Sequence, residues 1–510
     1  MLSHKKFFLK LAPVLILFSL FLVLKFYLLE QKAAVHPDES ATFTFSFDPN
    51  KDYAPYPSNG KEETHSEFHN NMYGKAPSSA SDVLKNIYKI RKDHKDIPHT
   101  NLYYSLVNIV AINSQDTFKA LIFRGGILNI ILFSISFFTA FNITGEFTTN
   151  SKIRLLTTLS AFISSAALSN SLFIREYQLQ ETSFLLLAYI VIKWYKIIRS
   201  ETTCAYEVEE ALHRYNFLIS SIIVSFSLLS GYFGIPLIIA ILIFLIIMCI
   251  YEKNLSFMNY IIILFITSII FAFAIYPDFM IGIFGNRGKE AINKVSFTYF
   301  INNINYILKT YFVLLSRYVY SCVGLCIISI YILFKIINPR KSFGFFIKIE
   351  FIIFISCIIW GICILYLAPY KSLRYIMAFV PLMITMTFFI LPRNIYLLLI
   401  LSICIISTNA NGIQNLNTSL SAIKDNNILI IYKNKWRLHT LSPYMENEES
   451  KITLLKENSV ADFPKADYKK FDVIIIEKEI NNILKDFSES LRKDNEHKLH
   501  PAWTSYRHKE

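Results

Sequence analysis

Long stretches of uncharged, apolar residues are the feature that most constrains the fold of this chain. The runs Leu218 to Ser230, Ile235 to Tyr251 and Tyr260 to Tyr276 carry no charged side chain. These runs approach or reach the length of about 20 mostly apolar residues that a helix needs to cross a bilayer. Of the 510 residues, 53% are hydrophobic and only 17% are charged, which is too apolar for a soluble globular protein of this size. The sequence therefore predicts a polytopic α-helical membrane protein.

Hydropathy places about eleven transmembrane helices in the chain. They lie near residues 8–29, 117–142, 154–172, 182–198, 214–230, 232–251, 257–276, 306–335, 349–367, 374–391 and 394–408. The first of them could be a cleaved signal peptide, because Lys5 and Lys6 precede its apolar core. It is long for that role, and Gln31 to Ala34 is a poor cleavage site, so that an uncleaved membrane anchor is favoured.

Basic residues gather in short loops between these runs, for example Lys152 with Arg154, and Lys335 with Arg340. Cytoplasmic loops are enriched in Lys and Arg, and the strongly basic loops all fall on the cytoplasmic side if the N-terminus is cytoplasmic. Topology then explains the net charge of +13, and no nucleic-acid-binding pattern accompanies it. We therefore expect the first loop, residues 30–101, and the C-terminal region to be extracytoplasmic. The first loop is expected to contain short helices, one of them around Ser81 to Lys92.

Residues 409–510 are predicted to form a small α/β domain that follows a membrane domain of residues 1–408. Asn427 to Tyr432 and Phe471 to Ile476 are apolar runs typical of buried parallel strands, and Ile480 to Arg492 is typical of a following helix. Neither strand leads into a glycine-rich phosphate loop, so that no nucleotide is expected here.

Three groups of polar residues are predicted to face the extracytoplasmic side. They are His36, Asp38 and Glu39 after the first apolar run, the segment Asp96 to Tyr104 with His99 at the end of the first loop, and Arg175, Lys371 and Arg374 at later span ends. A carboxylate can act as general base on an acceptor hydroxyl or amine, and guanidinium groups suit phosphate. The acidic group is equally compatible with a solvated loop, and for a single arginine a role as membrane anchor is favoured.

In combination, these motifs resemble those of the GT-C membrane glycosyltransferases. The Asp38-Glu39 pair resembles the acidic motif after their first span, and Asp96 to Tyr104 is similar to the His-Pro-Pro-Leu-Tyr-Tyr segment where their first loop re-enters the membrane. Arg374-Tyr375 followed by Pro381 is similar to their late Arg-Tyr…Pro span. The closest resemblance is to the bacterial branch of protein O-mannosyltransferases and the lipid A aminoarabinose transferase. It covers the span layout of residues 8–408 and a periplasmic C-terminal domain.

The resemblance implies an inverting glycosyltransferase of the bacterial cytoplasmic (inner) membrane. Its donor would be a sugar on a polyprenyl phosphate such as undecaprenyl phosphate, and its acceptor a lipid A, a glycan or a protein. Asp38 would be the catalytic base, Glu39 would support it or help bind a divalent metal, and Arg374 would hold the donor phosphate. We expect Arg175 and Lys371 to assist Arg374, and His99, Tyr103, Tyr104 and Tyr375 to contact substrate. The second motif departs from the family, because Pro98-His99-Thr100 displaces the histidine.

Two further classes of function remain as alternatives. Secondary transporters usually place ionisable residues near the bilayer midplane and often show inverted repeats, whereas the predicted span centres are nearly free of charge. A non-catalytic membrane assembly factor would leave Asp38, Glu39 and Arg374 dispensable. The sugar, the acceptor and the metal requirement stay open.

A pair of histidines in the first loop is a weaker candidate. His65 and His69 are four residues apart and would share one face of a helix, where they could bind zinc. No third ligand accompanies them in the sequence, so that a solvated loop is favoured.

Overall fold

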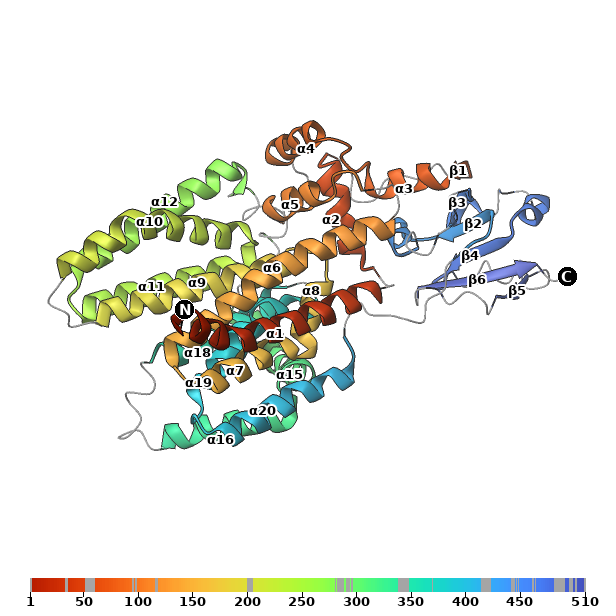
Figure 1. Ribbon diagram of the computed structural model, residues 1–510. Coiled ribbons are helices and arrows are strands. Elements are labelled where there is room, and N and C mark those ends of the chain that lie inside the picture. Colours follow the sequence, from red (N-terminus) through yellow and green to blue (C-terminus); the bar gives the residue numbers. More distant parts are fainter. Residues whose placement is uncertain are drawn as a thin grey trace. The chain divides into compact units, whose positions relative to one another are not determined.

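The computed structural model describes residues 2–32, 35–50, 60–93, 96, 99–114, 118–199, 205–279, 281, 289, 294, 297–337, 348–368, 370–413, 423–441, 445, 447, 449–460, 463, 465–480, 491–494, 499 and 502–508. These residues form 17 α-helices and a six-stranded mixed sheet (Figure 1). The chain divides into two compact units. Unit 1 comprises Met1–Phe26, Ile97–Tyr103 and Asn129–Gln414, and unit 2 comprises Tyr27–Asp96, Tyr104–Leu128 and Asn415–Glu510.

Unit 1 is built of helices. They are α1 (Leu2–Glu30), α6 (Phe118–Phe147), α7 (Ser151–Ile163), α8 (Ser165–Leu172), α9 (Tyr177–Arg199), α10 (Ala205–Leu229), α11 (Ile235–Tyr251), α12 (Leu255–Ile275), α15 (Phe297–Tyr318), α16 (Ser321–Ile337), α18 (Ile349–Leu367), α19 (Val380–Ile390) and α20 (Ile395–Ser407). Short 3-10 turns, η1 (Tyr232–Gly234), η2 (Leu373–Tyr375), η3 (Met377–Phe379) and η4 (Thr408–Asn411), lie between or after several of them. The end of α1 and the start of α6 belong to unit 2.

Several of these helices are long and apolar enough to cross a membrane. Four qualify alone, namely Leu11–Glu30, Lys119–Phe147, Leu255–Ile275 and Ile349–Leu367, and two bent pairs raise the number to six among the described residues. Each of the eleven predicted ranges contains a helix, but α11 and α20, among others, are shorter than a full span. A membrane protein with several apolar helices agrees with the sequence prediction, and the number of eleven spans stays a prediction.

Two predicted spans each consist of two helices with a bend between them, which the sequence did not indicate. Helices α7 and α8 bend by 61° at Ser164, whose extended backbone ends α7 and whose hydroxyl caps α8 by accepting the N–H of Ala167 at 3.2 Å. Helices α15 and α16 bend by 116°. Ser321 at this bend has a φ of +60°, which L-residues seldom adopt. The range 306–335 is therefore two helices at a sharp angle.

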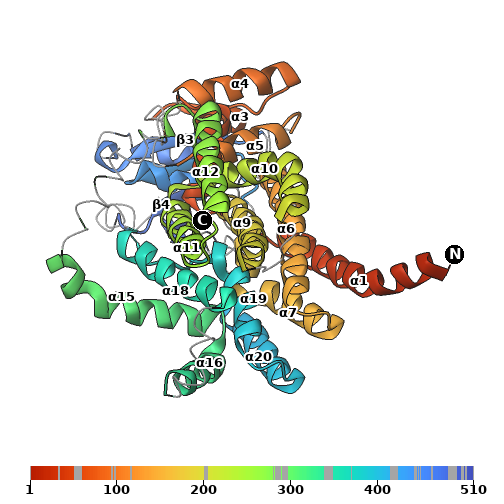
Figure 2. The same cartoon turned by 90° about the vertical axis from the view of Figure 1, so that its left-hand side faces the viewer.

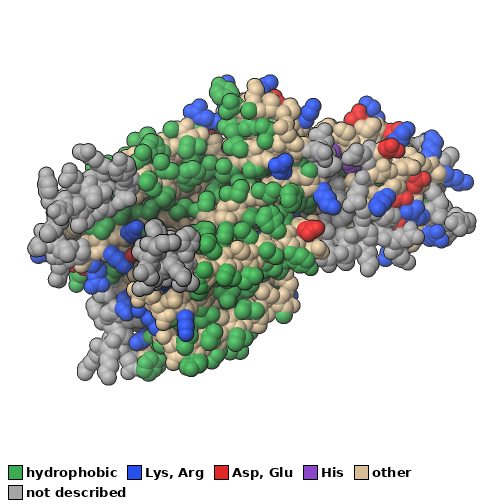
Figure 3. Space-filling view, viewed as in Figure 1, with side chains coloured by type: hydrophobic (Ala, Val, Ile, Leu, Met, Phe, Trp, Pro, Cys, Tyr) green, Lys and Arg blue, Asp and Glu red, His purple; other side chains and the backbone are tan. Residues whose placement is uncertain are grey.

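Helix α19 lies in the core of unit 1, where it packs against α7, α9 and α18. All its residues are buried, and its two hydroxyls are satisfied within the helix, because Thr385 donates to the carbonyl of Pro381 and Thr387 to that of Met383, each at 2.8 Å. The outer helices behave differently. In α11, Ile243, Ile247 and Ile250 are each more than half exposed, and hydrophobic side chains cover much of the helical surface in Figure 3. Such a surface suits lipid. Helices α16 and α20 lie side by side on this outer part in both views (Figures 1 and 2).

Unit 2 contains the sheet, whose strand order is β1-β3-β2-β4-β6-β5. The strands are β1 (Glu62–Thr64), β2 (Asn427–Tyr432), β3 (Lys451–Lys456), β4 (Val473–Glu477), β5 (Leu491–Lys493) and β6 (Trp503–His508). The central strand β2 runs parallel to β3 and β4, with Ile430 opposite Leu454 and Ile475, and the outer strands are antiparallel. The predicted parallel strands are confirmed as β2 and β4.

Other parts of the sheet differ from the prediction. Strand β1 comes from the first loop and pairs with the edge of β3, with Glu63 opposite Ile452. Strands β3, β5 and β6 were not predicted. Of the expected helix Ile480 to Arg492, residues 481–490 lie outside the described residues, and its end is wrong because Leu491–Lys493 form β5.

Short helices of the first loop complete unit 2. They are α2 (Pro37–Phe47), α3 (His65–Tyr73) and α4 (Ala80–Asp93), followed by α5 (Leu102–Val110), most of which also belongs here. Helix α4 confirms the helix predicted around Ser81 to Lys92. Ala41 and Phe45 of α2, Ile90 of α4 and Tyr104 of α5 form a small buried cluster that joins the three helices.

Candidate functional site

The acidic segment of the first loop forms the start of α2. Nδ1 of His36 accepts the backbone N–H of Asp38 at 3.1 Å, and the Glu39 carboxylate accepts the backbone N–H of His36 at 2.8 Å. This reciprocal capping box satisfies N–H groups that a helix start leaves without partners, and Pro37 needs none. The segment is therefore an ordered helix start and not a solvated loop.

Asp38 and Glu39 occupy different environments in unit 2. Oε1 of Glu39 lies 2.7 Å from Nζ of Lys32, and both side chains are completely buried. The Asp38 side chain keeps 23% of its accessible surface, and its carboxylate lies 3.6 Å from Nδ1 of His36. A general base has to be within reach of its substrate. Asp38 is thus the better candidate for a base, and Glu39 has a structural role in this geometry.

The second motif contributes to both units. In unit 2, Tyr104 Oη donates to Oδ2 of Asp96 at 2.5 Å. In unit 1, Tyr103 Oη donates to Oδ1 of Asn129 at 2.8 Å, and the Thr100 hydroxyl donates to the carbonyl of Leu229. Tyr103 and Tyr104 are each 1% exposed, and the Tyr103 phenol links α5 to α6, whereas the Tyr104 phenol links α5 to the end of the first loop. Ile97 and Pro98 lie outside the described residues.

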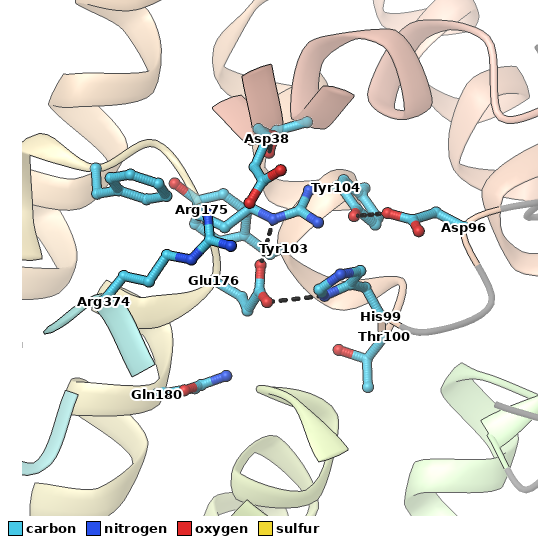
Figure 4. Close-up of polar contacts among 12 residues, drawn as sticks. Asp38, Asp96, His99, Thr100, Tyr103, Tyr104, Arg175, Glu176, Gln180 and Arg374 are labelled. Carbon is cyan, nitrogen blue, oxygen red and sulfur yellow. Dashed lines mark hydrogen bonds and ion pairs between the residues drawn. The ribbon is translucent and has the colours of Figure 1, made fainter. Parts of the chain in front are cut away.

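His99 is held by a residue that the sequence did not single out. In unit 1, Oε1 of Glu176 accepts a hydrogen bond from Nδ1 of His99 at 2.9 Å, while Oε2 lies 3.2 Å from Nε of Arg175 (Figure 4). Burial would raise the pKa of Glu176, but His99 and Arg175 outweigh burial and hold this pKa below its usual value. Glu176 is therefore an anion that orients both a histidine and an arginine.

Arg374 joins the same part of unit 1 through neighbouring tyrosines. Its Nη2 donates to Oη of Tyr375 at 3.1 Å, and its guanidinium carbon lies 5.0 Å from the centre of the Tyr375 ring. That ring meets Tyr177 edge to face at 6.3 Å, which brings η2 next to the start of α9, where Arg175 lies. Figure 4 shows the Arg374 side chain pointing toward Arg175. Two arginines far apart in the sequence are thus gathered at one place.

Lys371 has a more local role. Its Nζ donates to the carbonyl oxygens of Ala368 at 2.9 Å and Tyr366 at 3.4 Å, at the C-terminal end of α18. Cations are favourable at this end of a helix, where carbonyls lack partners. The geometry makes Lys371 a helix cap, and its contact with donor phosphate stays a prediction.

A second polar network lies within unit 1 near the start of α9. The Glu181 carboxylate accepts hydrogen bonds from the side-chain amides of Gln178 at 2.7 Å and Asn170 at 2.8 Å. Lys25 of α1 donates to the Ser171 hydroxyl at 2.7 Å and to the carbonyl of Ala167, and it attracts Glu181 electrostatically. These groups are buried, so that the network fixes α1, α8 and α9 around the arginine site.

The candidate metal ligands do not form a metal centre within the described part of the chain. No group of three or more His, Cys, Asp and Glu side chains there has the arrangement of a metal site. His65 and His69 do lie on one helix, α3, but they are 7% and 3% exposed, so that the prediction of a solvated loop was wrong for them. Metal binding by Asp38 and Glu39 stays a prediction.

Comparison with known proteins gives no match. No protein family, curated protein or solved structure matches this chain. Of the predicted site residues, unit 1 brings together His99, Arg175, Arg374 and Tyr375, and unit 2 holds Asp38, Glu39 and Tyr104. Glu176, which orients His99 and Arg175, directly follows Arg175 in the sequence, and this adjacency was the only local signal for it.

Proposed function

We propose that this protein is an integral membrane glycosyltransferase that moves a sugar from a polyprenyl-phosphate donor to an extracytoplasmic acceptor, with inversion. The motif resemblance supports this proposal, and one structural observation carries it. The ring contact between Tyr375 and Tyr177 brings Arg374 near Arg175 (Figure 4), in a unit that contains candidate membrane spans. Guanidinium groups are permanently charged and can bind phosphate oxygens through two parallel hydrogen bonds, which suits a lipid-linked phosphate at a membrane.

In the proposed reaction, Asp38 accepts the proton of the acceptor hydroxyl. The acceptor oxygen attacks the anomeric carbon from the face opposite to the phosphate, and the bond between that carbon and the phosphate oxygen breaks. Polyprenyl phosphate leaves with the electron pair, and Arg374 and Arg175 stabilise its charge. A single displacement of this kind inverts the anomeric configuration. Asp38 belongs to unit 2, and the two arginines belong to unit 1.

His99 has a defined place in this proposal. Because Glu176 holds Nδ1, the other ring nitrogen, Nε2, is the one that meets a ligand, and the side chain keeps 27% of its surface exposed. We assign it to donor binding beside the arginines. Tyr375 positions Arg374 through the hydrogen bond to its guanidinium and through its ring.

The proposal includes a topology. It places the N-terminus in the cytoplasm of a bacterium, about eleven helices across the inner membrane, and the first loop and C-terminal region outside. The apolar runs and the basic short loops support it. A donor on polyprenyl phosphate needs no nucleotide at the outer face.

The test is transfer by the purified full-length protein from a panel of polyprenyl-phosphate sugars. We expect the wild type to transfer at least one sugar, and Asp38→Asn to lose transfer while it keeps its folding. Undiminished transfer by Asp38→Asn would refute the assignment of the base. Failure of the wild type with every donor, together with solute flux in proteoliposomes, would favour a transporter.

One observation bears on the transporter alternative, because Lys25 and Glu181 are charged residues buried among the helices. Lys25 lies five residues before the end of α1 and Glu181 four residues after the start of α9, which corresponds to about 8 Å and 6 Å along the helices. Transporters usually bind their substrate near the bilayer midplane, further from the helix ends. The position of this pair therefore favours the glycosyltransferase, with Lys25 and Glu181 supporting the arginine site.

A further inference from the structure

The exposed side of α4 carries a pattern that the proposed reaction does not use. Leu84 is 69% exposed and Tyr88 is 59% exposed, although both are large apolar side chains. They are four residues apart and so lie about 40° from each other around the helix axis, in the middle of one exposed stripe. Single exposed apolar residues are ordinary on a protein surface, but a pair on one stripe marks a contact surface.

Basic residues flank this pair on both sides of the stripe. Arg91 lies on one side, Lys85 and Lys92 lie on the other, and all three are exposed. The stripe Ser81, Leu84, Lys85, Tyr88, Arg91 and Lys92 contains no acidic residue. Asp82 instead accepts hydrogen bonds from the hydroxyls of Ser78 at 2.7 Å and Ser79 at 2.9 Å at the helix start. An apolar centre between cations is the pattern of helices that lie in the headgroup region of anionic membranes.

The opposite side of α4 is anchored to the rest of unit 2. Val83 is 7% exposed, and Ile90 is fully buried in the cluster with Ala41 and Phe45 of α2. In Figures 1 and 2, α4 lies at the outer edge of the first-loop helices, and all six residues of its stripe are exposed. The stripe is thus presented on a fixed support.

The connection to a membrane span limits where this surface can be. The candidate span Leu11–Glu30 ends seven residues before Pro37, the start of α2, and this stretch can reach at most about 25 Å. Helix α2 packs on α4 through the buried cluster. The short connection therefore keeps the start of α2, and α4 packed on this helix, within reach of the headgroup region at the end of that span.

We infer that α4 is an interfacial helix that docks on anionic lipid headgroups. Leu84 and Tyr88 enter the boundary between headgroups and acyl chains, and Lys85, Arg91 and Lys92 bind lipid phosphates. This docking fixes the orientation of unit 2 against the bilayer, and it does not depend on the proposed glycosyl transfer.

The test places the photoreactive amino acid p-benzoylphenylalanine at position 84 of the full-length protein. Nanodiscs of phosphatidylcholine, with or without phosphatidylglycerol, are irradiated, and adducts are identified by mass spectrometry. The same substitution at Ser66, an exposed residue of α3 in unit 2, is the matched control. We expect lipid adducts at position 84, more of them with phosphatidylglycerol, and none above background at position 66.

A charge variant separates this surface from nonspecific attraction. In the variant Lys85→Gln, Arg91→Gln, Lys92→Gln, the ratio of lipid-adducted to free protein should fall by up to about fivefold for each charge removed, and only with phosphatidylglycerol. The variant Lys61→Gln, Lys75→Gln, Lys469→Gln removes three exposed charges elsewhere in unit 2 and should leave the ratio unchanged. Equal lipid adducts at positions 84 and 66, or adducts at 84 to protein instead of lipid, would overturn the inference. Unchanged melting temperatures of the variants exclude unfolding as the cause.

Discussion

Glu176 accepts a hydrogen bond from His99 across 2.9 Å, although 77 residues separate the two in the sequence. The contact orients the imidazole and, through the other carboxylate oxygen, the guanidinium of Arg175. One carboxylate thus sets the geometry of two of the predicted site residues. The protonation state of Glu176 therefore affects the orientation of both His99 and Arg175.

The pKa of Glu176 therefore predicts a pH dependence. Because His99 and Arg175 hold this pKa below its usual value of 4.5, the carboxylate stabilises the folded protein above that pH, and the contribution is lost as the pH falls through the lower, folded value. At pH 7, Glu176→Gln should cost about 2 kcal/mol, since it weakens a charged, buried hydrogen bond. The measurement is thermal unfolding of both proteins from pH 7 downward. The gap between them should shrink in acid, and a gap that stays constant to the lowest pH would contradict the assignment.

Arg374→Lys tests the binding of phosphate. Lysine keeps the charge but loses the planar fork of donors and the contact with the Tyr375 ring. We expect kcat/KM for the polyprenyl-phosphate donor to fall at least about tenfold, which corresponds to about 1.4 kcal/mol in transition-state binding. Arg393→Lys makes the same change at an exposed position after α19 and should leave kcat/KM unaltered. Equal effects of the two substitutions would remove Arg374 from the site.

Replacing Asp38 by asparagine should abolish transfer and leave stability nearly unchanged, whereas replacing Glu39 by glutamine should mainly lower stability. Asp38→Asn alters a partly exposed carboxylate, so that transfer is lost and stability changes little. Glu39→Gln leaves the buried Lys32 without its ion pair and should cost about 3–5 kcal/mol. The double variant Lys32→Met, Glu39→Gln should recover much of this stability. Transfer rates and melting temperatures, measured on the same preparations, separate the two roles. A Glu39→Gln protein with wild-type stability would disprove the structural role.

His69 makes unit 2 sensitive to acid. Burial, together with the neighbouring His65, lowers the pKa of His69 from 6.5 to about 4. Below pH 6.5 His69 is protonated in the unfolded chain, whereas in the folded protein it becomes protonated only near pH 4. The free energy of unfolding should therefore fall across this window, by up to about 3 kcal/mol.

The variant His69→Leu checks this sensitivity. It should flatten the slope of stability against pH between 6.5 and 4, as measured by chemical denaturation. Phe68→Leu, a buried substitution on the same helix, should lower stability and keep the slope. If the slope survives in His69→Leu, another group is responsible.

Local sequence patterns predicted the positions of the helices and of part of the sheet. Apolar runs located the helices of unit 1, and the runs at Asn427 and Phe471 located β2 and β4, because burial on both faces leaves a continuous apolar signature. The outer strand β6, Trp503–His508, is mostly polar and has no continuous apolar run, and it pairs with β4 through contacts that no local pattern contains. The bend at Ser321 depends on a positive φ, and a serine in the sequence does not indicate this backbone conformation.

The candidate site, too, was predictable from the sequence only in part. Arg374 and His99 stood out by residue type, and the acidic pair by its place after a span. Which carboxylate is reachable depended on Lys32, seven residues before Glu39, and on burial. The partnership of Glu176 with His99 is a tertiary contact, and residue type alone does not distinguish it from a chance neighbour of Arg175.

The pairing of β1 with β3 bears on how the protein is made. Strand β1, Glu62–Thr64, cannot pair until β3, Lys451–Lys456, has been synthesised. At ordinary translation rates, the roughly 390 residues between the two strands take about 20 to 80 s to synthesise. During that time the first loop lacks the strand beside which β1 lies. Final assembly of unit 2 is thus a late event in biosynthesis, and the interval gives chaperones a defined, short-lived form of the first loop to recognise.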